Sequence, residues 1–365
     1  MSIKDIPGSN ISQSGFGLRV LITTLMICAS SIALPQSFSL DSMGVFFVGG
    51  GRTDAPYSDG RDASLPTSGR STVSHQGKVS FFIPETVTGA NIILIPGFGL
   101  SSSIYLTTPD GREGWAQYFV RQGHPVYIMD IPHRSSSGFA IDAINGCMKA
   151  DPAFPCTEDI MLGKTSLEQP WSVWGFGPEF GVSFPDSRFP AQPLQENYIE
   201  QFGASFAVFS GSGRMGAATN GEASQQALAE LLDRVGPSVL IMHSAAGALG
   251  FRYARSSPTQ VKALVAVETV ACPAVDNADN PLAGIPFLAL YGDYVEARSA
   301  GGHPRRRASC KAAADAIGSH GTHARFIDLP GELAIKGNSH LMMQDNNSND
   351  LAGLISEWLQ AGQIR

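Results

Sequence analysis

One serine of this chain lies where a strand is expected to turn sharply into a helix. Residues 239–247 read VLIMHSAAG, in which an apolar run ends at His243 and Ser244 and only alanine and glycine follow. A strand–turn–helix elbow of this kind exposes the serine hydroxyl and needs small side chains around it. Met242 and Ala246 stand where the G-x-S-x-G form of the elbow has glycine. A buried strand followed by a serine-capped helix is therefore the alternative.

Three further polar residues, Glu268, Asp293 and His340, each follow a predicted strand. A serine hydroxyl needs an imidazole to take its proton, and the imidazole needs a carboxylate to fix its tautomer. The carboxyl ends of parallel strands meet at one edge of a sheet. The order serine, acid, histidine therefore predicts acyl transfer by a serine nucleophile, with His340 in the loop GNSHLMMQD as the base.

Two carboxylates compete for the role of the acid. Asp293 follows the strand that usually supplies the acid in this arrangement, so position alone favours it. Glu268 follows the preceding strand and has one more methylene of reach. Either could instead cap a helix or make a buried hydrogen bond. His243 is the weaker candidate for the base, because neighbours on a strand point to opposite faces, so its side chain is expected to point away from that of Ser244. For His340, the alternative is that it is simply a surface histidine in a loop.

The negative charge of a tetrahedral intermediate needs two backbone N–H donors. Ala245, directly after the serine, offers one, and the loop PGFG (96–99) is expected to offer the second at Phe98 or Gly99. The sequence contains no G-x-x-x-x-G-K-[ST], no G-x-G-x-x-G and no H-E-x-x-H pattern. Neither a metal nor a cofactor is therefore predicted.

The predicted elements place these residues on a mostly parallel sheet. Strands are expected over 45–48, 78–83, 90–95, 125–131, 238–242, 261–267, 286–291 and 324–329, and helices over 114–122, 221–235, 245–255, 307–318 and 349–359. Alternation of strands and helices predicts βαβ units and a parallel sheet. We therefore expect an α/β-hydrolase fold, a mostly parallel central sheet flanked by helices, over residues 35–365.

Residues 135–212 break this alternation and are rich in aromatic residues and proline. Such a segment is too aromatic for a disordered linker, so we expect a cap inserted into the α/β domain. Its residues Trp171, Trp174, Phe176 and Phe180 are candidates for an apolar pocket that takes the acyl or alcohol group. The alternative is that these aromatic side chains form the core of the cap itself.

The first 34 residues predict a secretory signal peptide. Lys4 and Arg19 precede an apolar run, Val20 to Leu34, that is too short for a comfortable membrane span. An uncleaved membrane anchor is the alternative. The expected location is periplasmic or secreted.

The cysteines support export. Four of the five lie beyond the predicted signal, and an even number in an exported protein favours disulfides. Cys147 and Cys156 are close together in a proline-containing loop and are expected to pair. Cys272 and Cys310 would then join two later loops, with four free thiols as the alternative.

Composition limits the partners. Hydrophobic residues make up 43% of the chain and charged residues 16%, a globular composition with material for a core. The net charge of −7 argues against nucleic acid or an anionic membrane surface as a partner. The oligomeric state is open, and a homodimer is one alternative.

Several segments resemble a small group of secreted bacterial carboxylesterases with the α/β-hydrolase fold and a Ser–His–Glu triad. The matching segments are TPDGREGWAQYFVRQGHPVY (108–127), FGPEF (176–180), PDSRFP (185–190), VLIMHSAAG (239–247), VAVETVACP (265–273), FLALYGDYVE (287–296) and GNSHLMMQDNN (337–347). The resemblance implies that Ser244 is the nucleophile, His340 the base and Glu268, rather than Asp293, the acid. It also implies a Cys272–Cys310 bridge.

The chain departs from that group in three places. PGFG stands where relatives carry a His-Gly-Gly-Gly type of loop, Ala246 stands where they often have serine or glycine, and the region around Cys147 and Cys156 has no match. The expectation is an exported serine esterase that works through an acyl-enzyme without a cofactor. An amidase, lactonase or polyester hydrolase with the same triad is the alternative, as is a non-catalytic binding protein on the same scaffold.

Overall fold

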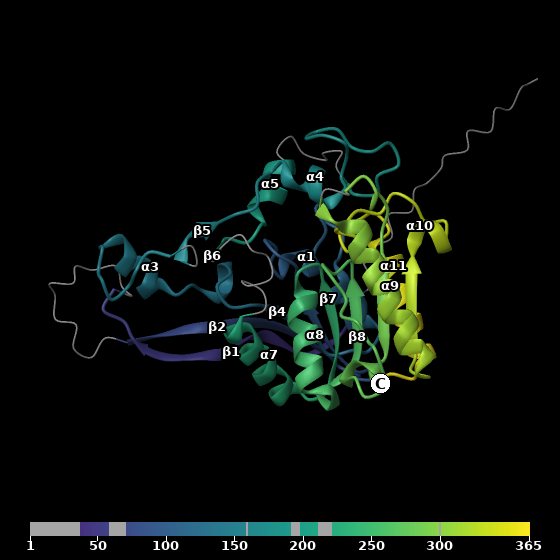
Figure 1. Ribbon diagram of the computed structural model, residues 1–365, viewed down its shortest axis with the longest axis horizontal. Coiled ribbons are helices and arrows are strands. Elements are labelled where there is room, and N and C mark those ends of the chain that lie inside the picture. Colours follow the sequence, from purple (N-terminus) through teal and green to yellow (C-terminus); the bar gives the residue numbers. More distant parts are fainter. Residues whose placement is uncertain (1–36, 58–70, 158–159, 191–197, 211–220, 299–300) are drawn as a thin grey trace, which may run out of the picture. The chain divides into compact units, whose positions relative to one another are not determined.

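An eight-stranded, mostly parallel sheet forms the centre of the protein (Figure 1). The computed structural model describes residues 37–57, 71–157, 160–190, 198–210, 221–298 and 301–365. The strand order is β1-β2-β4-β3-β7-β8-β9-β10. Neighbours from β4 to β10 pair in parallel, whereas β2 runs antiparallel to both β1 and β4. The strands are β1 (Leu40–Asp54), β2 (Ser71–Pro84), β3 (Asn91–Ile95), β4 (Val126–Asp130), β7 (Ser238–His243), β8 (Val261–Val267), β9 (Phe287–Tyr291) and β10 (Ala324–Asp328).

Helices cover both faces of this sheet, which is why its inner strands are apolar throughout. Alternate residues of β3 enter different clusters: Ile92 and Leu94 pack on one face, and Ile93 and Ile95 on the other. The first face is covered by α2 (Trp115–Arg121) and α11 (Ser348–Ala361), and the second by α7 (Glu222–Val235), α8 (Ala246–Ser256) and α9 (His303–Ser319). A parallel strand buried on both faces reads as a continuous apolar run.

Strands β1 and β2 are much longer than the sequence predicts. They pair from Leu40↔Pro84 to Asp54↔Ser71 and form a ribbon that projects beyond the other strands (Figure 1). The prediction covered only the parts where apolar residues recur. The outer half is rich in glycine and polar residues, so backbone hydrogen bonds rather than an apolar pattern hold it together.

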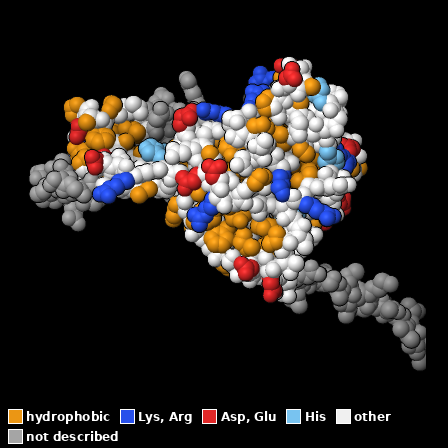
Figure 2. Space-filling view, turned by 90° about the horizontal axis from the view of Figure 1, so that it is seen from below, with side chains coloured by type: hydrophobic (Ala, Val, Ile, Leu, Met, Phe, Trp, Pro, Cys, Tyr) orange, Lys and Arg blue, Asp and Glu red, His pale blue; other side chains and the backbone are white. Residues whose placement is uncertain are grey.

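The inserted segment, residues 135–212, follows β4 and adds no strand to the large sheet within its described part. It packs along the ribbon, where the Tyr57 amide donates a hydrogen bond to Asp142 at 2.7 Å (Figure 1). The lobe that the ribbon and α3 form shows patches of apolar side chains at its surface (Figure 2). The elements of the segment are η1 (Ser135–Ser137), α3 (Ile141–Met148), β5 (Leu162–Gly163), α4 (Gln169–Trp174), α5 (Tyr198–Ala204) and β6 (Phe209–Ser210), of which β5 and β6 form a separate antiparallel pair.

Short elements complete the described chain. They are α1 (Ser103–Leu106), η3 (Pro258–Gln260), η4 (Pro281–Gly284) and α10 (Leu329–Glu332). No helix among the described residues is long and apolar enough to span a membrane. The predicted signal peptide, residues 1–34, lies outside the described residues.

Both predicted disulfides, Cys147–Cys156 and Cys272–Cys310, are present. The expectation that the second bridge joins two loops was wrong. Cys310 lies within α9, as it already does within the helix predicted over 307–318, so the bridge joins a loop to a helix. This helix begins at His303, four residues before the predicted start. Pro304 occupies the first turn of this helix, where a missing backbone N–H costs nothing.

Candidate active site

Ser244 lies on a strained turn between β7 and α8. Its φ of 52° falls in the left-handed region, which non-glycine residues rarely adopt. The turn is closely packed, because a Cβ added to Gly97 would lie 2.8 Å from the Ser244 Cβ. Strain of this kind persists where the surrounding structure enforces it and is concentrated at functional sites.

The presence of Met242 in the elbow motif has a packing explanation. Met242 points away from the turn into the buried cluster of the α8 face, where a Cβ added to Gly250 would lie only 2.0 Å from its sulfur. Gly247, the last residue of the motif, faces Thr269, whose Cβ would lie 2.6 Å from an added Cβ. A bulky residue is therefore accommodated at position 242, whereas position 247 requires glycine.

His340 lies beside this turn and contacts Glu268. Its Nδ1 is 2.6 Å from Oε2 of Glu268, and both side chains are almost fully buried. A carboxylate can only accept, so Nδ1 carries the proton and donates it. The other ring nitrogen, Nε2, is then unprotonated and can accept a proton, which is the tautomer that a general base requires.

Four donors surround the Glu268 carboxylate. Oε1 accepts from the Gly292 amide at 2.9 Å and from Arg298 at 3.1 Å, and Oε2 accepts from Arg298 at 2.8 Å as well as from His340. Burial by itself would raise the pKa of Glu268. The Arg298 guanidinium and the bond from His340 outweigh burial and hold that pKa well below its usual range. Glu268 is therefore ionised.

His340 is neutral at neutral pH. Burial lowers the pKa of its imidazole, and although the hydrogen bond and charge of Glu268 oppose this shift, the cation of Arg298 adds to it. A neutral imidazole next to an ionised carboxylate is the resting state that accepts a proton from a hydroxyl group.

Asp293, which strand position favours as the acid, has other partners in the structure. Its oxygens accept hydrogen bonds from the backbone amides of Tyr294 at 2.7 Å and Gly337 at 3.0 Å. It thus anchors the loop that carries His340. The carboxylate that contacts His340 is Glu268, as the family resemblance implies.

Asp345 fixes the same loop from the other side. This buried carboxylate accepts hydrogen bonds from the Ser339 amide and hydroxyl at 2.8 and 2.7 Å and from the Asn338 side chain at 2.9 Å. The loop also touches the inserted segment, because the His340 amide donates to the Trp174 carbonyl at 2.8 Å. His340 is thereby held in place by the bonds of the two preceding residues to Asp345 and by the bond of its own amide to Trp174.

The candidate oxyanion donors lie around the elbow. Within the part of the chain that the structure describes, the amides of Phe98, Gly99 and Ala245 donate no hydrogen bond. Gly99 has a φ of 71°, so the PGFG loop turns sharply there. The buried Arg134 holds this loop by donating to the Gly97 carbonyl at 2.6 Å. The PGFG loop therefore offers unpaired N–H groups next to Ser244.

His243 is fully buried beneath the turn. Its Nε2 lies 3.0 Å from the His340 carbonyl oxygen, to which it must donate, and its Nδ1 faces Gly97. Burial and the nearby His340 hold the pKa of His243 well below its usual range, so the ring is neutral. It supports the His340 loop from below.

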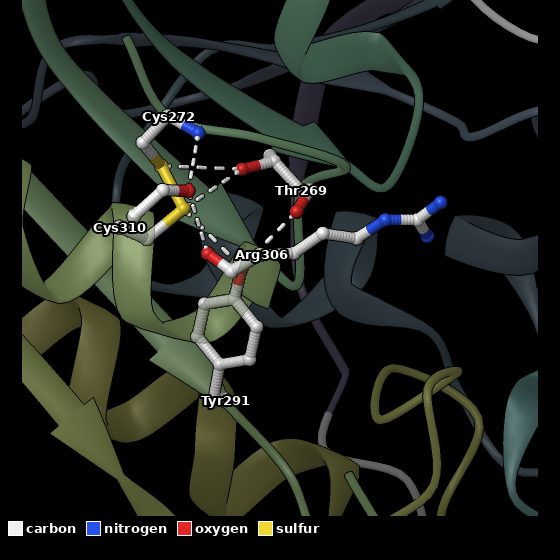
Figure 3. Close-up of a disulfide and its surroundings, with 6 residues drawn as sticks. Thr269, Cys272, Tyr291, Arg306 and Cys310 are labelled. Atoms are coloured by element: carbon white, nitrogen blue, oxygen red, sulfur yellow. Dashed lines mark hydrogen bonds between the residues drawn. A yellow bond between two sulfur atoms is a disulfide. The ribbon is translucent and has the colours of Figure 1, made fainter. Parts of the chain in front are cut away.

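A disulfide packs against the turn that carries Glu268 (Figure 3). The hydroxyl of Thr269, the next residue, lies 3.4 and 3.5 Å from the sulfurs of Cys272 and Cys310. The Tyr291 hydroxyl donates to the Thr269 carbonyl at 3.0 Å. Glu268 itself has a φ of 43°, so the contacts of the disulfide and of Tyr291 with Thr269 lie next to a second strained residue of the site.

The geometry does not suit a metal ion. Glu268, His303 and His340 offer ligand atoms within 4.8 Å of one another. However, both oxygens of Glu268 are bonded to Arg298, whose positive charge lies where a divalent cation would have to approach. Cation binding would require that guanidinium to leave a buried ion pair, which is strongly unfavourable.

The aromatic candidates for the substrate pocket divide into two groups. Trp171, Trp174 and Phe176 are at most 4% exposed and pack on one another with ring centroids 5.6 and 6.3 Å apart. Their burial favours the alternative that they form the core of the inserted segment. Phe180 is 49% exposed and packs on Trp171 at 5.0 Å, so it stays a candidate for contact with substrate.

Arg298, His303 and Asp345 are parts of the site that the sequence reasoning missed. Arg298 lies two residues beyond the matching segment 287–296, and nothing in residue type or spacing marks it. Asp345 does lie within the matching segment 337–347, so the density of polar residues after His340 was an available signal.

No family model matches this chain, but it is similar to known proteins, among them a secreted lipase and a bacterial esterase. The probable secreted lipase phiG of Fungal sp. (strain ATCC 74256) is 25% identical over 338 residues, which cover 77% of this chain and 85% of the lipase. A bacterial esterase known at atomic resolution is 29% identical, with a TM-score of 0.77, and the match covers 90% of this chain and 98% of the esterase. These likenesses confirm the α/β-hydrolase fold and the resemblance to secreted esterases. They support an esterase-like or lipase-like hydrolase.

Proposed function

We propose that the protein is an exported serine esterase that hydrolyses carboxylic esters through an acyl-enzyme intermediate. The observation that carries the proposal is the 2.6 Å contact between His340 and the ionised, buried Glu268, next to a serine held at positive φ. The similarity to an esterase and a secreted lipase supports ester substrates.

The arrangement of these residues supports the following roles. The Ser244 hydroxyl attacks the acyl carbon while Nε2 of His340 takes its proton, and Glu268 stabilises the imidazolium that forms. The amides of Ala245 and of Phe98 or Gly99 then donate to the oxyanion, because they have no other partner in the described chain. His340 passes its proton to the leaving alkoxide, and a water activated by the same imidazole releases the acid.

Export is the second part of the proposal. Two disulfides are rare in a protein that stays in a reducing cytosol. One of the similar proteins is described as secreted. A periplasmic or secreted location satisfies both observations.

Pre-steady-state kinetics with a p-nitrophenyl ester test the mechanism. An acyl-enzyme predicts a burst of p-nitrophenol equal to the concentration of active sites. The burst should vanish in Ser244→Ala and persist in Ser319→Ala, a surface serine at the end of α9. Full turnover by Ser244→Ala would refute the assignment.

A further inference from the structure

Arg298 is a buried cation behind the proposed catalytic acid. Only 1% of its side chain is exposed, and its guanidinium contacts both oxygens of Glu268, at 2.8 and 3.1 Å. Two parallel N–H···O bonds of this kind fix the plane of a carboxylate as well as its position. Arg298 thus contacts both oxygens of Glu268, and Oε2 accepts from Arg298 and His340 together.

The surroundings hold Arg298 in place. Nη2 also donates to the Asp293 carbonyl at 2.9 Å, and Nε lies 3.4 Å from the Tyr294 carbonyl. The side chain packs against Gly175 of the inserted segment, where an added Cβ would lie 3.2 Å from Nε. The guanidinium therefore cannot turn away from Glu268 without losing several contacts at once.

This arrangement changes the electrostatics of the triad. A carboxylate next to a lone imidazole strongly favours the protonated imidazole. Here the permanent charge of Arg298 already compensates the charge of Glu268, so the carboxylate favours the imidazolium less. Arg298 acts through Glu268 and does not touch the reacting atoms.

We propose that Arg298 is a positioning residue for this esterase: it clamps the Glu268 carboxylate toward His340 and sets the lowest pH at which His340 works as a base. The proposal rests on the proposed function, since it assigns a role within the same triad. It goes beyond that function by naming what sets its pH range.

The other ionisable groups around His340 do not replace Arg298. The rings of His243 on β7 and His303 on α9 lie beside the His340 imidazole, with centroids 4.6 and 5.5 Å from its centroid. Burial lowers the pKa of both, to about 3 for His303, so both are neutral in the working pH range. Arg306 on α9 adds a second cation that lowers the pKa of His340. Burial raises the pKa of Asp345, before α11, to about 7, and the charge of Glu268 adds to this rise, so Asp345 carries no permanent charge. Within this set, only Arg298 contacts the catalytic carboxylate and carries a permanent charge.

Two substitutions separate charge from geometry. Arg298→Met removes the cation but keeps most of the volume, so the pKa of His340 should rise and the acid limb of kcat/KM should move up by about one pH unit. Arg298→Lys keeps the charge but loses the two-point contact, so the limb should stay near that of the wild type while kcat falls about tenfold. Arg252→Met, a half-exposed arginine paired with Glu222, is the control and should change neither.

Kinetics are normalised to active sites titrated with a fluorophosphonate, so that loss of folded protein is not counted as loss of activity. A purely structural role predicts reduced stability with an unmoved acid limb in Arg298→Met, and that result overturns the proposal. If Arg298→Met does not fold, Arg298→Gln takes its place with the same expected shift. If the acid limb of Arg298→Lys moves as far as that of Arg298→Met, the positive charge at position 298 does not set the pH range, and that part of the proposal is overturned.

NMR titration of isotope-labelled histidine supplies a readout that needs no turnover. The His340 resonance should titrate at a higher pH in Arg298→Met than in the wild type, with Arg252→Met unchanged. This measurement holds even if Ser244 proves not to be the nucleophile, so failure of the Arg298 role and failure of the proposed function are distinguishable. Identical His340 titrations in the wild type and Arg298→Met would rule the role out.

Discussion

Replacing Glu268 with glutamine should inactivate the enzyme by reversing the tautomer of His340. The Oε1 position accepts from the Gly292 amide and from Arg298, and the Oε2 position from Arg298 and from His340. Of these donors only His340 can become an acceptor, so the oxygen of the new amide should occupy the Oε1 position. The NH₂ group then lies at the Oε2 position and faces Nδ1 of His340. Because NH₂ can only donate, Nδ1 must accept and the proton moves to Nε2. A base with its accepting nitrogen protonated cannot take the Ser244 proton.

The expected loss is large. A reversed tautomer with intact geometry costs about 10⁴-fold in kcat in the well-studied serine protease case, or about 5.4 kcal/mol of transition-state stabilisation. Asp293→Asn is the matched control. It removes one of the two backbone hydrogen bonds that the Asp293 side chain accepts, from Tyr294 or from Gly337 of the His340 loop, each worth about 1 kcal/mol. We expect a loss of about tenfold or less.

The assay is steady-state hydrolysis of a p-nitrophenyl ester, with thermal unfolding measured on each variant to show that the fold is retained. If Asp293→Asn loses more activity than Glu268→Gln, the acid has been assigned to the wrong carboxylate. Equal, small losses would mean that neither carboxylate orients the base.

Three further results are expected. The acid limb of kcat/KM in the wild type should have its midpoint below about pH 6.5, because burial lowers the pKa of His340 and the base is active when neutral. A midpoint above that value would contradict the lowered pKa of His340. Gly97→Ala should lower kcat by about 10²-fold or more, since the added Cβ would lie 2.8 Å from Ser244 Cβ and His243 Nδ1, whereas Gly51→Ala, with nothing within 4 Å, should be neutral. Replacing the Cys272–Cys310 pair with serine should lower the free energy of unfolding by about 4 kcal/mol, and replacing the Cys147–Cys156 pair by about 2.5 kcal/mol. The difference arises because the first bridge closes a loop of 38 residues and the second a loop of 9. Equal losses in denaturant titrations would show that loop length does not determine the effect.

The inner part of the sheet could be predicted closely from the sequence. Strands β3, β7, β8 and β9 begin and end within two residues of the predicted bounds, because strands buried on both faces are continuous apolar runs bounded by polar or turn residues. The ribbon of β1 and β2 could not, since its outer pairing depends on backbone hydrogen bonds between residues with no apolar pattern.

The candidate site was predictable only in part. Ser244 and His340 follow from the elbow and from strand order, but strand order favoured Asp293 over Glu268. The deciding feature is local conformation: the positive φ of Glu268 and its bond to the Gly292 amide aim the carboxylate at His340, and neither is visible in a strand pattern. Arg298 reaches Glu268 from thirty residues further along the chain, a contact that residue spacing does not encode.

The central claim is that Ser244 is a nucleophile activated by His340. Mass spectrometry of the peptide that contains Ser244, after reaction with a fluorophosphonate, tests it most directly. We expect one phosphonyl adduct per chain, located on Ser244, and loss of the adduct in His340→Ala. An unmodified Ser244, or an adduct on another residue in a protein that still hydrolyses esters, would contradict the claim.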